Sequence, residues 1–186
     1  MKPNNTTSRR NLIKNLTVAS TVGSVSFVGN AAANSCRSNQ KNSTDNPYYL
    51  GRDWDTELLA DLTTYWCRQW GTGKSTIKAY SDSEAHTYDV DGNDDAAEYI
   101  ELNSTIEFYG DRVTFDSKYP EYEYTGTSVS YTTSTSNDSS EVHGMNEIDA
   151  TVKGHDYTEL SVLAYIEKDG RSVTYDATAT IDRYTE

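Results

Sequence analysis

Residues 160–179, LSVLAYIEKDGRSVTYDATA, carry a clear pattern of two strands joined by a tight turn. Asp169-Gly170 is a strong signal for a two-residue hairpin turn, because the residues at the tip of such a turn need a positive φ. If the chain folds back there, apolar residues lie opposite apolar residues on one side, and polar residues lie opposite each other on the other side. A shift by one residue would exchange the two sides, so the sequence specifies the register. The partners predicted on the buried side are Ile166–Val173, Ala164–Tyr175, Val162–Ala177 and Leu160–Ala179.

The same alternation of apolar and polar residues runs through the chain from residue 74 onward. Alternation with a period of two is typical of strands that bury one face. We predict three more antiparallel pairings: Phe108–Val113 and Ile106–Phe115 around a turn at Gly110-Asp111, residues 122–124 with 129–131 around Gly126, and residues 148–152 with 160–162 across a loop at 154–156.

Residues 53–70 carry the one helical pattern. Large apolar side chains recur there at steps of three and four residues, which places them on one stripe of a helix. Asp53 or Asp55 would cap its start, and Gly71 would end it. We expect the stripe to pack against a sheet and not to form an exposed aromatic binding strip, since large exposed apolar stripes are rare. The stripe consists of Trp54, Leu58, Leu62, Tyr65, Trp66 and Trp70.

These patterns predict a mainly β domain. About seven or eight antiparallel strands would form a sandwich or an open barrel, with one N-terminal amphipathic helix packed at one end. The predicted domain spans residues 48–186. Residues 34–47 before it are polar and without period, and we expect them to form a flexible stalk.

The charge of the chain excludes some partners. The 186 residues include 16 Lys and Arg against 29 Asp and Glu, a net charge of −13. Such a chain repels nucleic-acid phosphates and anionic lipid headgroups, so neither is an expected partner.

Residues 1–33 have the layout of an export signal peptide. The basic residues Lys2, Arg9, Arg10 and Lys14 precede a mildly apolar stretch at 16–28, and three alanines at 31–33 supply a cleavage pattern. The apolar stretch is too short and too polar to span a membrane. We therefore expect an exported protein, extracellular or at the cell surface, without a membrane span.

The run SRRNLIK at 8–14 resembles the twin-arginine export motif, in which Arg9 and Arg10 would be the signal pair. An Arg-Arg pair in a general secretory leader is the alternative. Removal of 1–33 takes away four of the 16 basic residues and no acidic one, which leaves 12 against 29 and a net charge of −17. Such a leader before so acidic a domain resembles an exported protein of a salt-loving archaeon, where molar salt shortens the Debye length to ~3 Å.

Two cysteines, Cys36 and Cys67, follow the predicted cleavage site. An even pair in an exported protein favours a disulfide, which would close a loop of about 30 residues. The alternative is a lipid anchor on Cys36.

Two motifs resemble known binding loops. GTGKST at 71–76 looks like the end of a phosphate-binding loop, but residue 68 is Arg where Gly is required, so we expect a turn. DVDGNDD at 89–95 alternates like a calcium loop, but the EF-hand Gly and Glu positions hold Asp94 and Ile100. We favour an acidic loop there, with a loose calcium turn as the alternative and calcium as the one cofactor considered. Its candidate ligands are Asp89, Asp91, Asn93 and Asp95.

The remaining residues predict no catalytic site. The histidines His86, His143 and His155 show no metal-binding spacing, and no Gly-x-Ser-x-Gly motif occurs. The tyrosines in YPEYEY at 119–124 suit sugar or protein recognition as well as core packing, and in a chain with three Phe we favour packing.

The sequence therefore favours a small exported, non-catalytic β-domain that binds an extracellular protein or glycan or acts at the cell surface. The alternatives are a secreted antagonist toxin of bacteriocin type and a small secreted hydrolase. A cleft that holds a histidine or a close carboxylate pair would favour the hydrolase.

Overall fold

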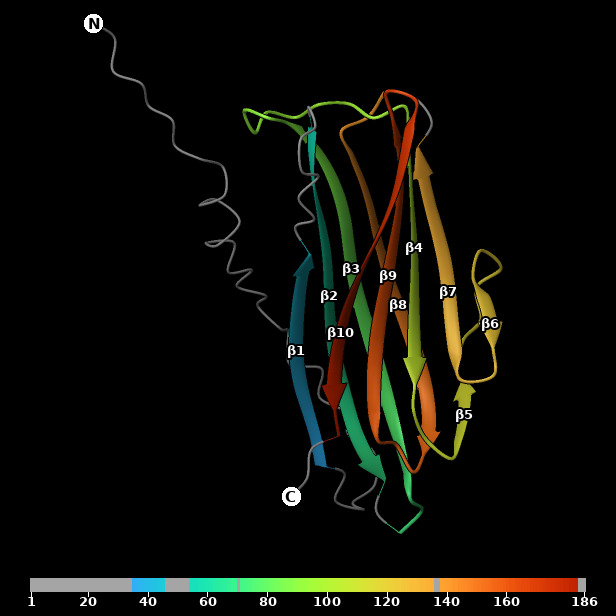
Figure 1. Ribbon diagram of the computed structural model, residues 1–186. Coiled ribbons are helices and arrows are strands. Elements are labelled where there is room, and N and C mark those ends of the chain that lie inside the picture. Colours follow the sequence, from blue (N-terminus) through green and yellow to red (C-terminus); the bar gives the residue numbers. More distant parts are fainter. Residues whose placement is uncertain (1–34, 46–53, 70, 136–137, 184–186) are drawn as a thin grey trace, which may run out of the picture. The chain divides into compact units, whose positions relative to one another are not determined.

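The computed structural model describes residues 35–45, 54–69, 71–135 and 138–183. They form two antiparallel five-stranded sheets, which lie face to face (Figure 1). Sheet I has the order β1 (Ser35–Asp45), β2 (Trp54–Gln69), β3 (Lys74–Asp89), β8 (Glu141–Lys153) and β5 (Arg112–Phe115). Sheet II has the order β10 (Arg171–Asp182), β9 (Tyr157–Lys168), β4 (Tyr99–Phe108), β7 (Ser128–Thr135) and β6 (Glu123–Thr125).

This arrangement confirms the mainly β, antiparallel domain, and within the described residues the two sheets do not close into a barrel. Within the described ranges no helix is long and apolar enough to cross a membrane. The signal motif at Arg9 and Arg10 lies outside the described residues.

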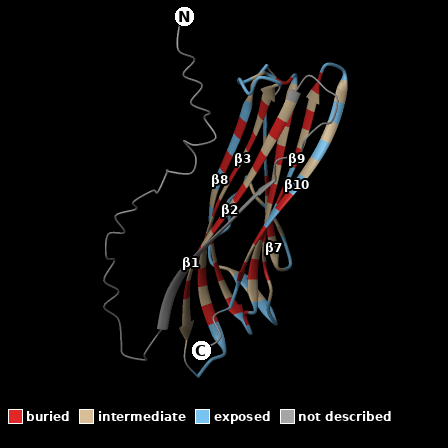
Figure 2. Ribbon diagram, turned by 60° about the vertical axis from the view of Figure 1, so that its left-hand side comes forward, coloured by how far each residue is buried: buried red, intermediate tan, exposed pale blue. Residues whose placement is uncertain are grey.

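The long strands alternate strictly between core and surface, as Figure 2 shows for β2 and β3. On β3 every second residue is buried, and most of these residues are small. Small side chains let two long sheets approach closely, with larger residues such as Phe108 and Ile148 filling the remaining space. The buried residues of β3 are Ser75, Ile77, Ala79, Ser81, Ser83, Ala85 and Thr87.

The helix predicted at 53–70 is wrong: residues 54–69 form strand β2, which pairs with β3 along its whole length. A step of four residues is a multiple of two, so Leu58, Leu62 and Trp66 share one face of a strand as well as one face of a helix. The residues between them, Ala60 and Thr64, are also buried. The buried face of this segment therefore follows the two-residue repeat of a strand.

The flexible stalk predicted at 34–47 is also replaced by a strand. Residues 35–45 form β1, which pairs antiparallel with β2 from Ser35 opposite Arg68 to Asp45 opposite Leu58. Polar residues suit this position, because β1 is one of the two edge strands of sheet I in the described chain.

The C-terminal hairpin is confirmed in register. β9 and β10 pair so that Ile166 lies opposite Val173 and Leu160 lies opposite Ala179. Asp169 and Gly170 form the tip with φ of 52° and 68°, as this turn requires. The pairing of residues 122–124 with 129–131 is confirmed through β6 and β7, where Tyr124 lies opposite Val129.

The hairpin predicted at Gly110-Asp111 is wrong. The chain crosses there from sheet II to sheet I, and β5 pairs with β8, with Val113 opposite Val152. A Cβ on Gly110 would lie 2.6 Å from Val152 Cγ1, so only glycine lets the crossing pass this close to β8.

The pairing predicted between residues 148–152 and 160–162 is wrong as well. Both segments are strands, and residues 154–156 connect them. However, β8 lies in sheet I and β9 lies in sheet II, so this short connection joins the two sheets.

Candidate functional site

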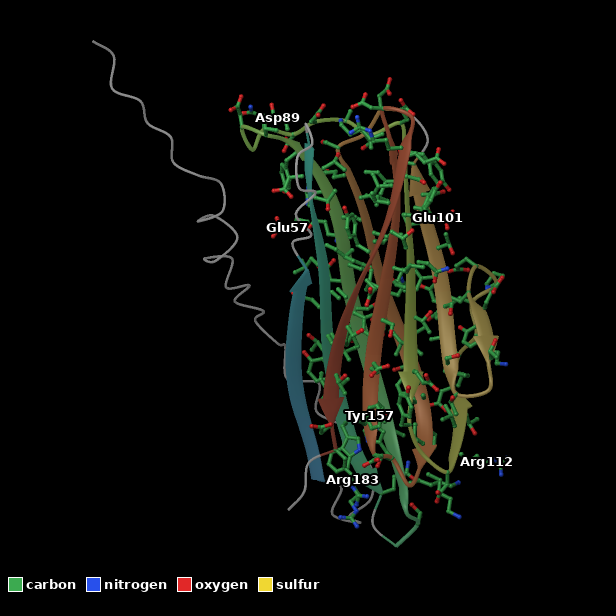
Figure 3. The ribbon with its side chains drawn as sticks, viewed as in Figure 1. Glu57, Asp89, Glu101, Arg112, Tyr157 and Arg183 are labelled. Atoms are coloured by element: carbon green, nitrogen blue, oxygen red, sulfur yellow. The ribbon has the colours of Figure 1, made fainter. Side chains whose placement is uncertain are left out.

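The outward face of sheet I gathers acidic residues and two of the three histidines. Outward side chains come from odd positions on β2 and β8 and from even positions on β3, because the three strands pair antiparallel in fixed register. Three rows run across β2, β3 and β8: Glu57–His86–Glu141, Leu59–Glu84–His143 and Asp61–Asp82–Met145. Figure 3 labels Glu57 near the end of the sandwich that carries Asp89.

His86 lies among carboxylates. Its Nε2 is 2.6 Å from Glu84 Oε1, and its Nδ1 is 3.8 Å from Glu141 Oε2. Burial alone would lower the pKa of His86, but the hydrogen bond that its imidazole donates to Glu84 and the charges of Glu84, Glu141 and Glu57 outweigh this effect and raise the pKa. The same hydrogen bond lowers the pKa of Glu84. This cluster can hold a cation, either a proton or a metal ion.

Asp82 and His143 form a second carboxylate–imidazole pair. His143 Nε2 lies 2.5 Å from Asp82 Oδ1, and each side chain is nearly half exposed. Across β2, Asp61 lies opposite Asp82. Burial, followed by the charge of Asp82, raises the pKa of Asp61 to about 6. Two carboxylates and an imidazole therefore follow one another across three adjacent strands.

An open depression lies beside this pair, on the side of the sandwich where β7 and β8 face each other. β5 pairs with β8 only at residues 150–153, and β6 pairs with β7 only at 128–130, so residues 141–149 and 131–135 border the sheets in the described chain. The depression has a volume of about 320 Å³. Its lining consists of Glu121, Tyr122, Tyr131, Thr132, Thr133, His143, Gly144, Met145 and Asn146.

The tyrosines are divided between packing and surface. Tyr131 is buried, and its ring lies 5.9 Å from the half-buried ring of Tyr122. Gly144 makes room for this packing, since a Cβ there would lie 3.1 Å from both Tyr131 and Thr133. Tyr119 and Met145 are exposed, at 43% and 68%. The lining thus offers aromatic area together with amide, hydroxyl and imidazole groups.

The candidate calcium ligands are not gathered into one set of contacts. Asp89 Oδ1 accepts hydrogen bonds from the backbone N–H groups of Asp91 and Asn93, at 2.9 and 2.8 Å. Asp95 instead lies 2.8 Å from the ammonium of Lys168. The loop is an acidic turn that closes on its own amides, and calcium binding there remains a prediction.

The glycine-rich motif, the two cysteines and the third histidine also lie within the described residues. Residues 71–73 form the turn between β2 and β3, with Gly71 and Gly73 at positive φ, as expected for a turn and without the helix expected before it. Cys36 lies directly opposite Cys67 in the β1–β2 register. His155 is buried at the connection between β8 and β9, with Nε2 3.0 Å from Thr158 Oγ1.

Sequence reasoning missed the clusters around His86 and His143. Glu84 and His86 are two residues apart in a segment of period two, which already places them on one face. Their partners Glu141 and His143 come from a strand more than fifty positions later, and only the β3–β8 register joins them. Comparison of the chain with protein-family models gives no match, and comparison with curated proteins gives none either.

Proposed function

We propose that this protein is an exported binding domain that recognises a neutral glycan through the open depression between β7 and β8. The observation that carries the proposal is the lining of that depression, where tyrosine rings lie beside Thr132, His143 and Asn146. Aromatic faces pack against the C–H faces of sugars, and hydroxyl and amide groups exchange hydrogen bonds with sugar hydroxyls.

The size and charge of the site support the same ligand class. A volume of about 320 Å³ is at the lower end of the ~300–1,000 Å³ typical of small-molecule sites, which suits one or two sugar rings of a longer chain. The net charge of −13 and the acidic face of sheet I disfavour anionic polysaccharides.

A panel of immobilised neutral oligosaccharides, probed with the secreted protein in high-salt buffer, tests the proposal. We expect binding to at least one glycan and about fivefold or more weaker binding by Tyr122→Ala, since loss of an aromatic packing surface of this kind costs about 1 kcal/mol or more. Tyr109→Ala is the control, because Tyr109 stacks on Tyr157 away from the depression. If no neutral glycan binds, or if both variants bind equally well, the proposal is wrong.

A second candidate, a small hydrolase, is favoured by the Asp82–His143 pair at the rim of the depression. Asp82 would orient the imidazole, and His143 Nδ1 would accept a proton from a water molecule whose oxygen attacks the substrate. The proton would then pass to the leaving group. Hydrolysis of chromogenic glycosides or esters that is lost in His143→Gln and kept in His86→Gln would support this candidate; no hydrolysis by the wild-type protein would exclude it for those substrates.

A further inference from the structure

We propose that Glu84, His86 and Glu141 bind a divalent transition-metal ion of the zinc type on the outer face of β3 and β8. One ligand atom from each of the three residues lies within 4.8 Å of the others. Ligand atoms around zinc, at ~2.0–2.2 Å from the ion, lie within about 4 Å of one another. The side chain of Glu141 is 65% exposed, so it has room to turn toward an ion held by the other two residues.

The sheet fixes where these donors lie. Glu84 and His86 are separated by one residue on β3, so both point outward on the same face. Glu141 on β8 lies directly opposite His86. Donors that come from two hydrogen-bonded strands keep their spacing, because the ladder holds both backbones.

Neighbouring side chains hold the imidazole in place. The ring of Tyr88 stacks on His86 with centroids 5.8 Å apart and planes 12° apart. Glu57 lies opposite His86 on the other neighbouring strand, and its negative charge acts on both His86 and Tyr88. The His86 side chain is only 18% exposed, so its ring has few alternative positions. Outer partners of this kind orient a metal ligand and tune its affinity.

The chemistry of the donors selects the ion. Two carboxylates and one neutral imidazole carry a charge of about −2, which matches a divalent cation. An imidazole nitrogen favours zinc, copper or nickel, whereas calcium and magnesium prefer oxygen ligands alone. The site therefore prefers a different metal ion from the acidic turn at 89–95, which offers oxygen ligands. Three protein ligands leave a position for water, one row along the sheet from His143.

Titration calorimetry with Zn²⁺ on the metal-free, folded protein tests the proposal, together with the visible absorption of bound Co²⁺, whose intensity reports four-coordination. We expect the wild-type protein to bind a single Zn²⁺. Binding should be more than about 100-fold weaker in His86→Ala and at least about tenfold weaker in Glu141→Gln. The reason is that the loss of even an outer partner of a metal ligand weakens metal binding by ~10–100-fold. His143→Ala is the matched control, since this imidazole lies against Asp82 and is not one of the three proposed ligands. The affinity of this variant for Zn²⁺ should stay within about threefold of that of the wild-type protein.

A second readout keeps the test independent of the calorimetry. Zn²⁺ should raise the melting temperature of the wild-type protein and of His143→Ala and leave that of His86→Ala unchanged. If His86→Ala does not fold, Glu141→Gln still tests the site, because Glu141 is exposed and its substitution keeps the size of the side chain. The proposal is overturned if the folded wild-type protein binds no Zn²⁺, if His86→Ala or Glu141→Gln binds Zn²⁺ as tightly as the wild-type protein does, or if His143→Ala weakens binding as much as His86→Ala does.

Discussion

The hydroxyl of Tyr131 lies 3.0 Å from Ser83 Oγ and so joins the two sheets through the core. Tyr131 belongs to β7 of sheet II, and Ser83 belongs to β3 of sheet I. Ser83 also contacts Ser104 Oγ at 2.8 Å, and Tyr131 contacts Ser81 Oγ at 3.0 Å. These four buried hydroxyls satisfy one another within the core, and Tyr131 also lines the depression.

Tyr131→Phe should lower the free energy of unfolding by about 1–2 kcal/mol, because Ser81 and Ser83 each lose a buried hydrogen-bond partner. Denaturant unfolding followed by tyrosine and tryptophan fluorescence measures the difference. Tyr119→Phe, at an exposed ring, serves as the control and should change the value by less than about 0.5 kcal/mol. Equal stability of the wild type and Tyr131→Phe would mean that the hydroxyl cluster does not stabilise the contact between the sheets.

The buried histidine at the β8–β9 connection should make the fold acid-sensitive. Burial, followed by repulsion from Arg183, lowers the pKa of His155 to about 4. The unfolded chain takes up this proton near the ordinary pKa of 6.5, so the contribution of His155 to stability is present above pH 6.5 and is lost as the pH falls toward 4. The loss amounts to about 3 kcal/mol.

His155→Gln removes this titration. Between pH 7 and pH 4 the free energy of unfolding of the wild-type protein should therefore fall by about 3 kcal/mol more than that of His155→Gln, whatever the absolute stability of the variant. Urea unfolding at a series of pH values checks it. Parallel pH profiles for the two proteins would show that His155 is protonated equally in the folded and the unfolded chain.

Lys168 ties the segment before β4 to β9. Its side chain is only 7% exposed, its ammonium lies 2.8 Å from Asp95 Oδ2, and it donates a hydrogen bond to the carbonyl of Ala96. Asp95→Asn leaves this buried ammonium without its carboxylate, and we expect a loss of about 1–3 kcal/mol, moderated by the partial exposure of Asp95. Thermal unfolding of Asp95→Asn and of the exposed control Glu98→Gln measures it; a loss no larger than that of the control contradicts this role for the ion pair.

Cys36 and Cys67 should form a disulfide between β1 and β2. Directly opposite residues of an antiparallel pair have Cα atoms ~4.5–5.5 Å apart, within the range that a disulfide spans. Replacement of both cysteines by serine should lower stability by about 3–4 kcal/mol, since the loop is about 30 residues long. Mass spectrometry of the secreted protein before and after reduction checks the bond, and a lipid mass on Cys36 would favour the anchor instead.

The sequence predicted those parts of the fold in which a local signal determines the partner. Asp169-Gly170 and the alternation around it specify the β9–β10 register, and Gly126 does the same for β6 and β7. Elsewhere the alternation predicts a strand but does not indicate which strand it pairs with. Phe115 meets Phe108 across the core, with ring centroids 6.0 Å apart, because the chain changes sheets at Gly110.

The error at 53–70 has a related cause. Apolar residues four positions apart suit both a helix and a strand, and the small buried residues Ala60 and Thr64 were weak signals for period two. The candidate site, like the β5 pairing, could not be predicted because it depends on contacts between segments that are far apart in the sequence. Glu84 and His86 are two positions apart in the sequence. Glu141 comes next to them, and the depression beside His143 forms, only when β8 pairs with β3.

The most direct test of a ligand site between β7 and β8 compares two matched substitutions of exposed apolar residues. Met145 lines the depression and is 68% exposed, whereas Leu163 is 47% exposed on β9 of the other sheet. Met145→Arg and Leu163→Arg change the net charge equally, and both should keep the wild-type melting temperature, since exposed substitutions shift stability by less than about 0.5 kcal/mol. Titration of each variant with the neutral glycan found in the panel should give at least about tenfold weaker binding for Met145→Arg, and unchanged binding for Leu163→Arg. Equal affinity of the two variants for that glycan would contradict the placement of the site.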